Sequence, residues 1–188
     1  MSTGENIVET IIYKKNDDEV KIIDHFFSEE VLEKIVDYFK KIEWKCQCNK
    51  DRNVTNESGD SPYWRIELEN ETFFNSYLKN IIEQYLNKQL QLNRIYVVGQ
   101  TYGQDSIFHI DDKKVNTFTC CFYINDEYND DSGSFYLKIP NEKYIISIKP
   151  ILNRIIIFPS RYRHKGSGLS RFNNNLRLCI AWKFEILL

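Results

Sequence analysis

The sequence predicts an α+β fold, with helices in the first half of the chain and a run of short strands in the second. Two segments carry apolar residues at helical spacing, and after Asn93 the pattern changes to short runs rich in Val, Ile, Thr, Tyr and Phe, separated by turn residues. Helices followed by six or more strands indicate a sandwich or jelly roll whose two sheets enclose a cavity. At 188 residues the chain is long enough for one domain with its own core.

Two helices are expected in the first half. A short strand over 20–24 precedes Ser28, a candidate N-cap that is followed by two glutamates in the first helical turn. Apolar residues then recur on one helical face: Val31, Leu32, Ile35, Val36 and Phe39. The segment 73–86 carries an aromatic and aliphatic stripe, which is typical of a helix packed in the core. Between the two helices, 46–62 is polar and is predicted to be a loop.

Six strands are expected in the second half. The predicted ranges are 94–98, 117–124, 134–139, 144–148, 154–158 and 176–184. We therefore expect a single domain over 1–188, with helical support and the polar loop in 1–91 and a jelly-roll core in 92–188.

The composition argues against several classes of protein. The five cysteines are odd in number and form no C-x-x-C pair, which argues against a disulfide framework and a zinc ribbon. The first residues do not form a secretory signal, and no run of about 18 apolar residues is available to span a bilayer. We therefore expect a cytoplasmic protein without a membrane partner.

Charge is distributed unevenly along the chain. The formal net charge of −2 gives no whole-domain electrostatic footprint for nucleic acid. From 143 to 183, however, there are nine Lys or Arg residues and no Asp or Glu. Such a run is either a solvated face or a positive pocket for an anionic ligand.

Two of the three histidines have a spacing that suits a metal site. If 108–111 is extended, His109 and Asp111 project to the same side, because side chains alternate along a strand. His164 follows 53 residues after Asp111, just beyond the apolar run 155–158. Together the three would form the 2-His-1-carboxylate set that binds non-haem Fe(II) and leaves positions open for chemistry. An H-x-D triplet alone is common by chance, so the rest of the pattern must support it.

The second half carries a longer pattern of motifs around this triplet. In order they are Tyr102-Gly103, His109-Ile110-Asp111, Thr119-Cys120-Cys121-Phe122-Tyr123-Ile124-Asn125, Gly133-Ser134-Phe135, Pro150-Ile151-Leu152-Asn153-Arg154, Ile157-Phe158-Pro159-Ser160, His164, Ser170-Arg171 and Arg177-Leu178-Cys179-Ile180-Ala181-Trp182-Lys183. This order resembles the Fe(II)- and 2-oxoglutarate-dependent dioxygenases, most closely their prolyl-hydroxylase-like branch, over roughly residues 92–184. The resemblance implies a double-stranded β-helix (jelly-roll) core with N-terminal supporting helices.

The resemblance implies roles for individual residues. His109, Asp111 and His164 look like the iron ligands, and Arg177 looks like the residue near the start of the last strand that binds the distal carboxylate of 2-oxoglutarate. Arginine suits that role, since its planar fork offers two parallel donors and stays charged inside a pocket. Tyr123 occupies the position where many members place a tyrosine hydroxyl on the same carboxylate.

Four further residues are candidates for the same carboxylate: Tyr102, Arg171, Arg154 and Lys183. The interval from His164 to Arg177 is longer than in many relatives, which leaves the choice between Arg171 and Arg177 open. The chain also has Gly133-Ser134 where the family often has two glycines, a difference that is expected to alter only a turn.

The resemblance implies a hydroxylase. Fe(II) and 2-oxoglutarate would be its cofactors and O2 its co-substrate, with ascorbate as an optional supporting reductant. The reaction would hydroxylate an unactivated C–H bond of a protein or peptide side chain, proline and lysine being the habitual targets, and would release succinate and CO2. Two alternatives stay open: an oxygenase that acts on nucleic acid or a small molecule, and a non-catalytic jelly-roll binding module.

Overall fold

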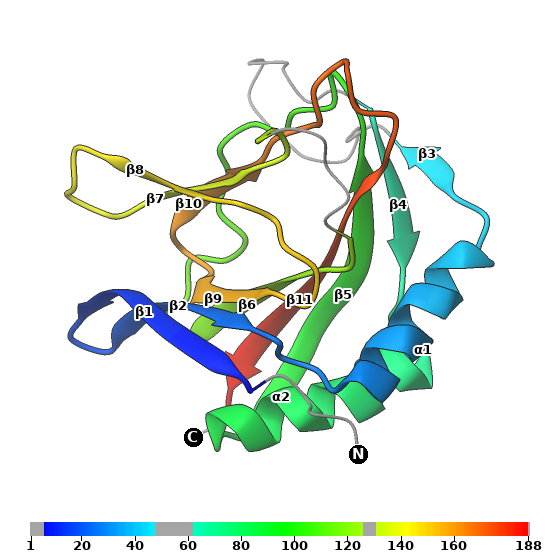
Figure 1. Ribbon diagram of the computed structural model, residues 1–188. Coiled ribbons are helices and arrows are strands. Elements are labelled where there is room, and N and C mark those ends of the chain that lie inside the picture. Colours follow the sequence, from blue (N-terminus) through cyan, green and yellow to red (C-terminus); the bar gives the residue numbers. More distant parts are fainter. Residues whose placement is uncertain (1–5, 48–61, 126–130, 188) are drawn as a thin grey trace.

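The computed structural model describes residues 6–47, 62–125 and 131–187 of the chain (Figure 1). Most of the predicted loop 46–62 lies outside these ranges, as does Cys48. Inside them, antiparallel strands account for most of the regular structure and helices for a smaller part.

The described strands form two sheets that face each other (Figure 1). Within the described ranges the larger sheet has eight strands, in the spatial order β1 (Val8–Lys15), β2 (Asp18–Asp24), β9 (Ile155–Pro159), β6 (Thr117–Tyr123), β11 (Arg177–Ile186), β5 (Leu90–Gln100), β4 (Tyr63–Glu67) and β3 (Lys45–Gln47). The smaller sheet, counted over the same residues, has three: β10 (Arg163–Gly166), β7 (Phe135–Lys138) and β8 (Ile145–Ile148). These antiparallel sheets confirm the predicted jelly-roll fold.

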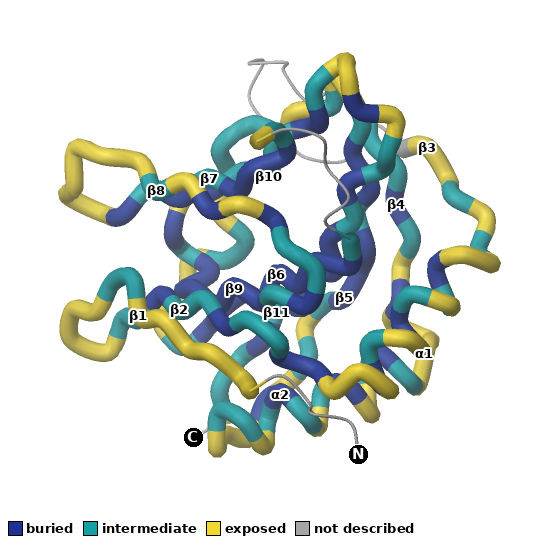
Figure 2. Tube along the Cα trace, in the orientation of Figure 1, coloured by how far each residue is buried: buried dark blue, intermediate teal, exposed yellow. Residues whose placement is uncertain are grey.

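The central strands of the larger sheet are buried on both faces (Figure 2). On β11, Ile180, Trp182 and Phe184 belong to the core cluster under the helices. Cys179 and Ala181, which alternate with these residues along the strand, point to the opposite side, toward the smaller sheet. Strands buried on both faces read as nearly continuous apolar runs, which is why these strands were predicted correctly from the sequence.

Helices cover the outer face of the larger sheet in the described structure (Figure 1). They are α1 (Glu29–Lys40) and α2 (Lys79–Leu86), and α2 continues a π-helical segment, η1 (Phe73–Leu78). Both predicted helices are therefore confirmed, although the π-helical winding at 73–78 was not predicted.

Side chains anchor each helix at its start. Ser28 caps α1, because its hydroxyl accepts a hydrogen bond from the backbone N–H of Val31 at 3.4 Å. The indole of Trp182 on β11 donates to the carbonyl of Phe74 at 3.2 Å, which ties η1 to the sheet. No helix in the described ranges has both the length and the apolar character needed to cross a bilayer.

Four of the described strands were not predicted from the sequence: β1, β3, β4 and β10. Strand β1 lies at the edge of the larger sheet and is largely exposed, so it carries little of the alternation that marks a buried strand. Strand β10 has the sequence Arg-His-Lys-Gly and therefore no apolar side chain. Its two buried or half-buried inward positions are His164 and Gly166, which belong to a cavity rather than to the core.

A buried asparagine joins the start of the helical layer to the jelly roll. Asn153 lies in the turn before β9 with a φ of 62°. Its side chain accepts from the backbone N–H of Phe27 at 2.9 Å and donates to the Phe27 carbonyl at 2.7 Å. Its own carbonyl accepts from the N–H of Phe26 at 3.1 Å, and its N–H donates to Tyr123 on β6 at 3.0 Å. One residue thus connects the segment before α1 to the centre of the larger sheet.

We expect Asn153→Ala to lower the free energy of unfolding by about 3 kcal/mol, because two buried backbone groups lose their partners and alanine is strained at positive φ. Chemical denaturation measures this difference. Asn141 is a suitable control, since it has a similar φ of 68° but is exposed, so that Asn141→Ala should cost only about 1 kcal/mol. Equal losses in the two variants would mean that the contacts of Asn153 contribute nothing.

Candidate functional site

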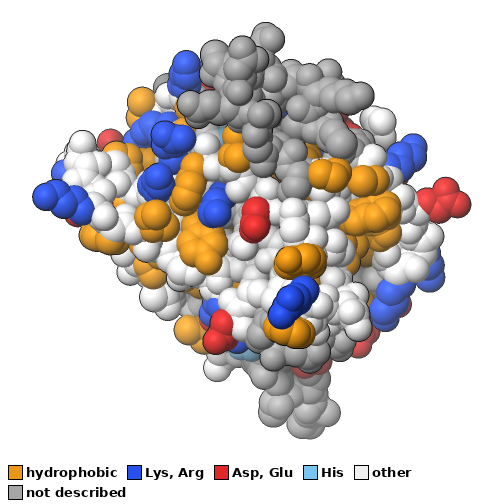
Figure 3. Space-filling view, turned by 90° about the horizontal axis from the view of Figure 1, so that it is seen from above, with side chains coloured by type: hydrophobic (Ala, Val, Ile, Leu, Met, Phe, Trp, Pro, Cys, Tyr) orange, Lys and Arg blue, Asp and Glu red, His pale blue; other side chains and the backbone are white. Residues whose placement is uncertain are grey.

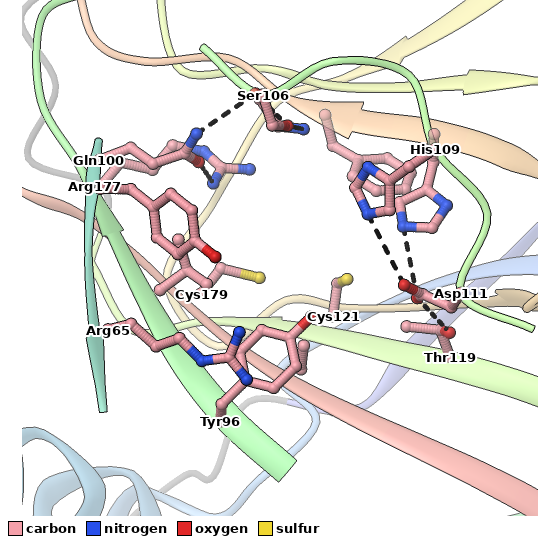
Figure 4. A pocket seen from close by; sticks show the side chains of 16 residues that line it. Arg65, Tyr96, Gln100, Ser106, His109, Asp111, Thr119, Cys121, Arg177 and Cys179 are labelled. Carbon is pink, nitrogen blue, oxygen red and sulfur yellow. Dashed lines mark hydrogen bonds and ion pairs between the residues drawn. The ribbon is translucent and has the colours of Figure 1, made fainter. Parts of the chain in front are cut away.

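Two histidines and an aspartate converge at one end of the space between the sheets (Figure 4). His109 and His164 form an antiparallel bridge, in which the His109 N–H donates to the His164 carbonyl at 3.0 Å and the reverse bond measures 2.9 Å. Asp111 is fixed two residues further on, where its N–H donates to the carbonyl of Ser160 at 2.9 Å. One ligand atom from each of the three side chains lies within 4.8 Å of the other two.

Backbone carbonyls orient both imidazole rings. Nδ1 of His109 lies 3.0 Å from the carbonyl oxygen of Ile107, and Nδ1 of His164 lies 2.9 Å from that of Tyr162. A carbonyl oxygen can only accept, so we assign the proton to Nδ1 in each ring. Nε2 of each ring then faces the Asp111 carboxylate. Nε2 of His109 lies 3.6 Å from Oδ1, and Nε2 of His164 lies 3.4 Å from Oδ2. Carbonyls fix the rings of metal-binding histidines in the same way, so this donor set fits a divalent metal.

The Asp111 carboxylate is buried and held at both oxygens. The hydroxyl of Thr119 donates to Oδ2 at 2.8 Å, and the ammonium of Lys183 donates to Oδ1. Burial by itself would raise the pKa of Asp111, but the neighbouring His164, Lys183 and His109 side chains more than offset burial and hold this pKa well below its ordinary value. The carboxylate is therefore ionised and able to act as a ligand.

A buried arginine occupies the opposite end of the same space (Figure 4). Arg177 is the first residue of β11 and is 2% exposed. Its guanidinium donates to Gln100 Oε1 at 2.8 Å, to the Tyr123 hydroxyl at 3.3 Å and to the carbonyl of Gly133. These three acceptors are neutral, so they orient the positive charge without cancelling it.

A glycine keeps the space beside this guanidinium open. A Cβ added to Gly166 on β10 would lie 2.8 Å from Gln100 Oε1 and 3.1 Å from Arg177 NH1. Any side chain at position 166 would therefore displace the guanidinium or its partner. An opening next to a buried, oriented arginine suits a carboxylate ligand.

One cavity of about 100 Å³ joins the two ends, with room for several water molecules. Alternate residues of three strands of the larger sheet form one wall: Tyr96, Val98 and Gln100 on β5, Thr119 and Cys121 on β6, and Arg177, Cys179 and Ala181 on β11. Phe135, His164 and Gly166 from the smaller sheet line the other wall. The arrangement can hold a cation at one end and an anionic group at the other.

No protein-family model matches the chain, and no curated protein matches its sequence. Solved structures do match its fold. A prolyl hydroxylase from Trichoplax adhaerens, in complex with a hypoxia inducible factor oxygen degradation domain peptide fragment, has a TM-score of 0.63 at 19% identity, over 88% of this chain and 83% of that chain. An oxidoreductase of the 2OG-Fe(II) oxygenase family from Burkholderia pseudomallei has a TM-score of 0.66 at 10% identity, over 95% of this chain and 84% of that chain.

A third similar structure is HygX from Streptomyces hygroscopicus, with nickel, 2-oxoglutarate and hygromycin B bound. Its TM-score is 0.61 at 10% identity, over 88% of this chain and 82% of that chain. The chain has the fold of the 2OG-Fe(II) oxygenases. The fold implied by the sequence resemblance is thus confirmed by solved structures, prolyl hydroxylase among them.

The 2OG-Fe(II) oxygenase fold places two of the predicted site residues outside the cavity. Tyr102 follows β5, is 65% exposed and does not line the cavity. Arg171 is exposed, and its guanidinium lies 4.8 Å from the centre of the Phe172 ring. Tyr123 and Arg177, by contrast, meet at the cavity end opposite the histidines. Of the two arginines left open by the sequence, the structure brings Arg177 to the cavity.

The basic run 143–183 is divided between several places in the oxygenase fold. Three of its members form salt bridges away from the cavity: Lys149 with Asp131, Arg154 with Asp24 and Arg161 with Asp18. Arg177 lies buried beside the cavity, and Lys183 is bound to Asp111. Other Lys and Arg side chains are visible on the face beside β7 and β8 (Figure 3). The run therefore supplies both surface charge and a positive cavity end.

Some cavity residues could not be singled out from the sequence. Gln100 supports Arg177 because the pairing of β5 with β11 places these two residues opposite each other. Arg65 lines the cavity from β4, where a charged residue occupies the buried position between Trp64 and Ile66. Thr119 belongs to the motif that carries the resemblance, but its bond to Asp111 depends on the tertiary structure. Each of these residues reaches the cavity through the pairing register of its strand, and the sequence alone does not determine that register.

We expect Thr119→Val to weaken divalent-metal binding by about 10- to 100-fold, because Asp111 loses the donor that orients Oδ2. Titration calorimetry with Mn(II) measures this affinity. Thr117 on the same strand is the control, since its hydroxyl donates to the Lys114 carbonyl at 3.0 Å, so that Thr117→Val should bind Mn(II) as the wild type does. Unchanged affinity in Thr119→Val would show that the Thr119 bond does not prepare Asp111 for metal binding.

Proposed function

We propose that this chain is an Fe(II)- and 2-oxoglutarate-dependent dioxygenase that hydroxylates an unactivated C–H bond. The observation that carries the proposal is one cavity with two matched ends. His109, Asp111 and His164 present two imidazole nitrogens and a carboxylate at one end, and Arg177 presents an oriented guanidinium at the other. Such a donor set suits Fe(II), and such a guanidinium suits the distal carboxylate of 2-oxoglutarate.

The residues have separate tasks in this proposal. His109, Asp111 and His164 would hold the metal, while Thr119 and Lys183 keep the Asp111 carboxylate in position. When bound, Fe(II), 2-oxoglutarate and O2 supply the hydroxylation, in which the substrate C–H becomes C–OH while 2-oxoglutarate becomes succinate and CO2.

The other end of the cavity would bind and align 2-oxoglutarate. Arg177 would grip its distal carboxylate, with Tyr123 as the second donor to that carboxylate. Gln100 holds the guanidinium in plane, and Gly166 leaves the carboxylate its space. Apolar neighbours such as Phe135 and Val98 limit the entry of water.

The substrate proposed first is a protein or peptide side chain, proline or lysine. Support comes from the similar prolyl hydroxylase of Trichoplax adhaerens, which is in complex with a peptide fragment. A small molecule is the second candidate, favoured by the similar structure of HygX with hygromycin B bound. A nucleic-acid substrate would give binding with a steep salt dependence, which a peptide substrate need not show. A binding module without activity would be expected to lack a ligand or an anchor, and neither is lacking here.

Succinate formation tests the reaction class. The wild-type protein, incubated with Fe(II), 2-oxoglutarate and O2, should release succinate slowly even without its substrate. His164→Ala and Asp111→Ala should each abolish this release while the unfolding transition stays cooperative, because each removes one metal ligand. Succinate release at near wild-type rate in either variant would remove that residue from the ligand set.

The choice of anchor is tested by the 2-oxoglutarate requirement. Arg177→Ala should raise the KM for 2-oxoglutarate by about 10- to 100-fold or more, through the loss of charge-assisted hydrogen bonds, and should leave Mn(II) affinity nearly unchanged. Arg171→Ala is the control and should leave both quantities unchanged, because its side chain is exposed and does not line the cavity. The reverse pattern would identify Arg171 as the anchor.

A further inference from the structure

The cavity contains a second buried arginine that the proposed reaction does not use. Arg65 lies on β4, is 4% exposed and lines the cavity together with Arg177. Figure 4 shows its side chain entering from β4 beside the ring of Tyr96, apart from the guanidinium of Arg177. The carbon at the centre of its guanidinium lies 3.9 Å from the centre of the Tyr96 ring. This stacking fixes the plane of the guanidinium.

The polar atoms of Arg65 are incompletely satisfied. Among the described residues, Nε and NH2 are buried side-chain atoms without a hydrogen-bond partner. Glu67 Oε1 lies 2.6 Å from NH2 and forms an ion pair with it, so Nε is the buried donor that stays unserved. Buried donors in native proteins are almost always hydrogen-bonded, so unsatisfied donors beside a cavity indicate a ligand that is bound there in the functional state.

The Arg65 guanidinium is charged. Burial by itself would lower its pKa, but Glu67, Tyr96 and Tyr63 more than offset burial, so the pKa is raised. Glu67 compensates this charge only in part, because its side chain is 44% exposed and also lies 3.4 Å from Arg94 NH2.

Arg65 adds positive charge to the cavity beyond the groups that the proposed cofactors would engage. A divalent metal and a doubly charged 2-oxoglutarate would cancel each other. Asp111 and Lys183 also cancel, and Arg177 would be engaged by the distal carboxylate of 2-oxoglutarate. Arg65 is then a further positive group, which Glu67 compensates only in part. A buried guanidinium that is only partly compensated beside this cavity favours an additional anion, which would come from the substrate.

We propose that Arg65 binds a carboxylate of the substrate, so that the enzyme oxidises an acid rather than a neutral side chain. This inference rests on the proposed function and specifies its substrate class. The planar fork of Arg65, held against Tyr96, matches the planar, two-oxygen geometry of a carboxylate. The carboxylate belongs either to a free amino acid or small organic acid, or to an acidic residue beside the oxidised residue of a peptide.

Ligand-observed NMR on the complete protein tests this inference. The protein is loaded with Mn(II) and saturating 2-oxoglutarate, and the metal then broadens the proton signals of any molecule bound near it. The first probe is propionate, with propionamide as its uncharged match. Propionate should be broadened in the wild type much more than propionamide. Equal broadening of the two would overturn the inference.

Two variants connect this binding to Arg65. Arg65→Met should weaken propionate binding by about tenfold or more, the effect expected for losing a hydrogen-bonded charge. Arg94→Met is the matched control, because Arg94 contacts the same Glu67 and Tyr96 without lining the cavity, and it should bind propionate as the wild type does. Unchanged binding in Arg65→Met would overturn the inference, as would a raised KM for 2-oxoglutarate with propionate unaffected.

Thermal unfolding separates a binding role from a structural one. If Arg65 serves a ligand, Arg65→Met should unfold at the same temperature as the metal-free wild type or higher, because unsatisfied buried donors are replaced by an apolar chain of similar length. A midpoint several degrees lower, together with retained propionate binding, would make Arg65 a structural residue.

The source of the carboxylate is found with matched pairs of probes. Free proline and lysine are compared with their amides, and a capped peptide containing Pro-Glu is compared with its Pro-Gln counterpart. Broadening confined to the free amino acids indicates a small-molecule enzyme, and broadening confined to the Glu peptide indicates a peptide enzyme. If the proton signals of 2-oxoglutarate itself are not broadened, the proposed function is contradicted. A failure of the proposed function is thus distinguished from a failure of the carboxylate inference.

Discussion

Burial of β11 on both faces is the constraint on which the rest of the structure depends. One face of this strand carries Trp182 and Phe184, which pack under the helices and are completely buried. The other face carries Arg177, Cys179 and Ala181, which line the cavity. Because side chains alternate with a period of two, a shift of one residue would move the arginine into the core and tryptophan into the cavity. The same register therefore determines both the stability and the chemistry of the protein.

The site concentrates charge in a place where charge is costly. Asp111 and Lys183 satisfy one another, and their ion pair is nearly enclosed. Arg177 donates to neutral acceptors such as Gln100, whereas Nε of Arg65 is buried without a hydrogen-bond partner in the described structure. A buried donor without a partner destabilises the free protein unless a ligand completes it, so the Arg65 guanidinium argues for binding. The cavity would thus be a preformed receptor for a metal and for more than one carboxylate.

Sequence reasoning succeeded where a local pattern decides the structure. His109 and Asp111 follow from strand alternation, and His164 from its place after an apolar strand, so the convergence of these three could be anticipated. Pairing across the sheets decides the rest. Gln100 meets Arg177 only through the register of β5 with β11. Arg65 reaches the cavity from β4, whose apolar residues flank the arginine and predict the opposite face as the buried one. Tyr102 was assigned by its position in a motif, but it lies where the chain leaves the sheet.

The most direct test of the central claim is an anaerobic titration of the purified protein, first with Fe(II) and then with 2-oxoglutarate, followed by visible absorption. If one cavity holds the metal at His109, Asp111 and His164 and the acid beside Arg177, a charge-transfer band of the chelate should appear in the wild type and be absent from His164→Ala. Absence of the band in wild-type protein that has been shown to contain Fe(II) would contradict the account, because the cavity would then bind something other than 2-oxoglutarate.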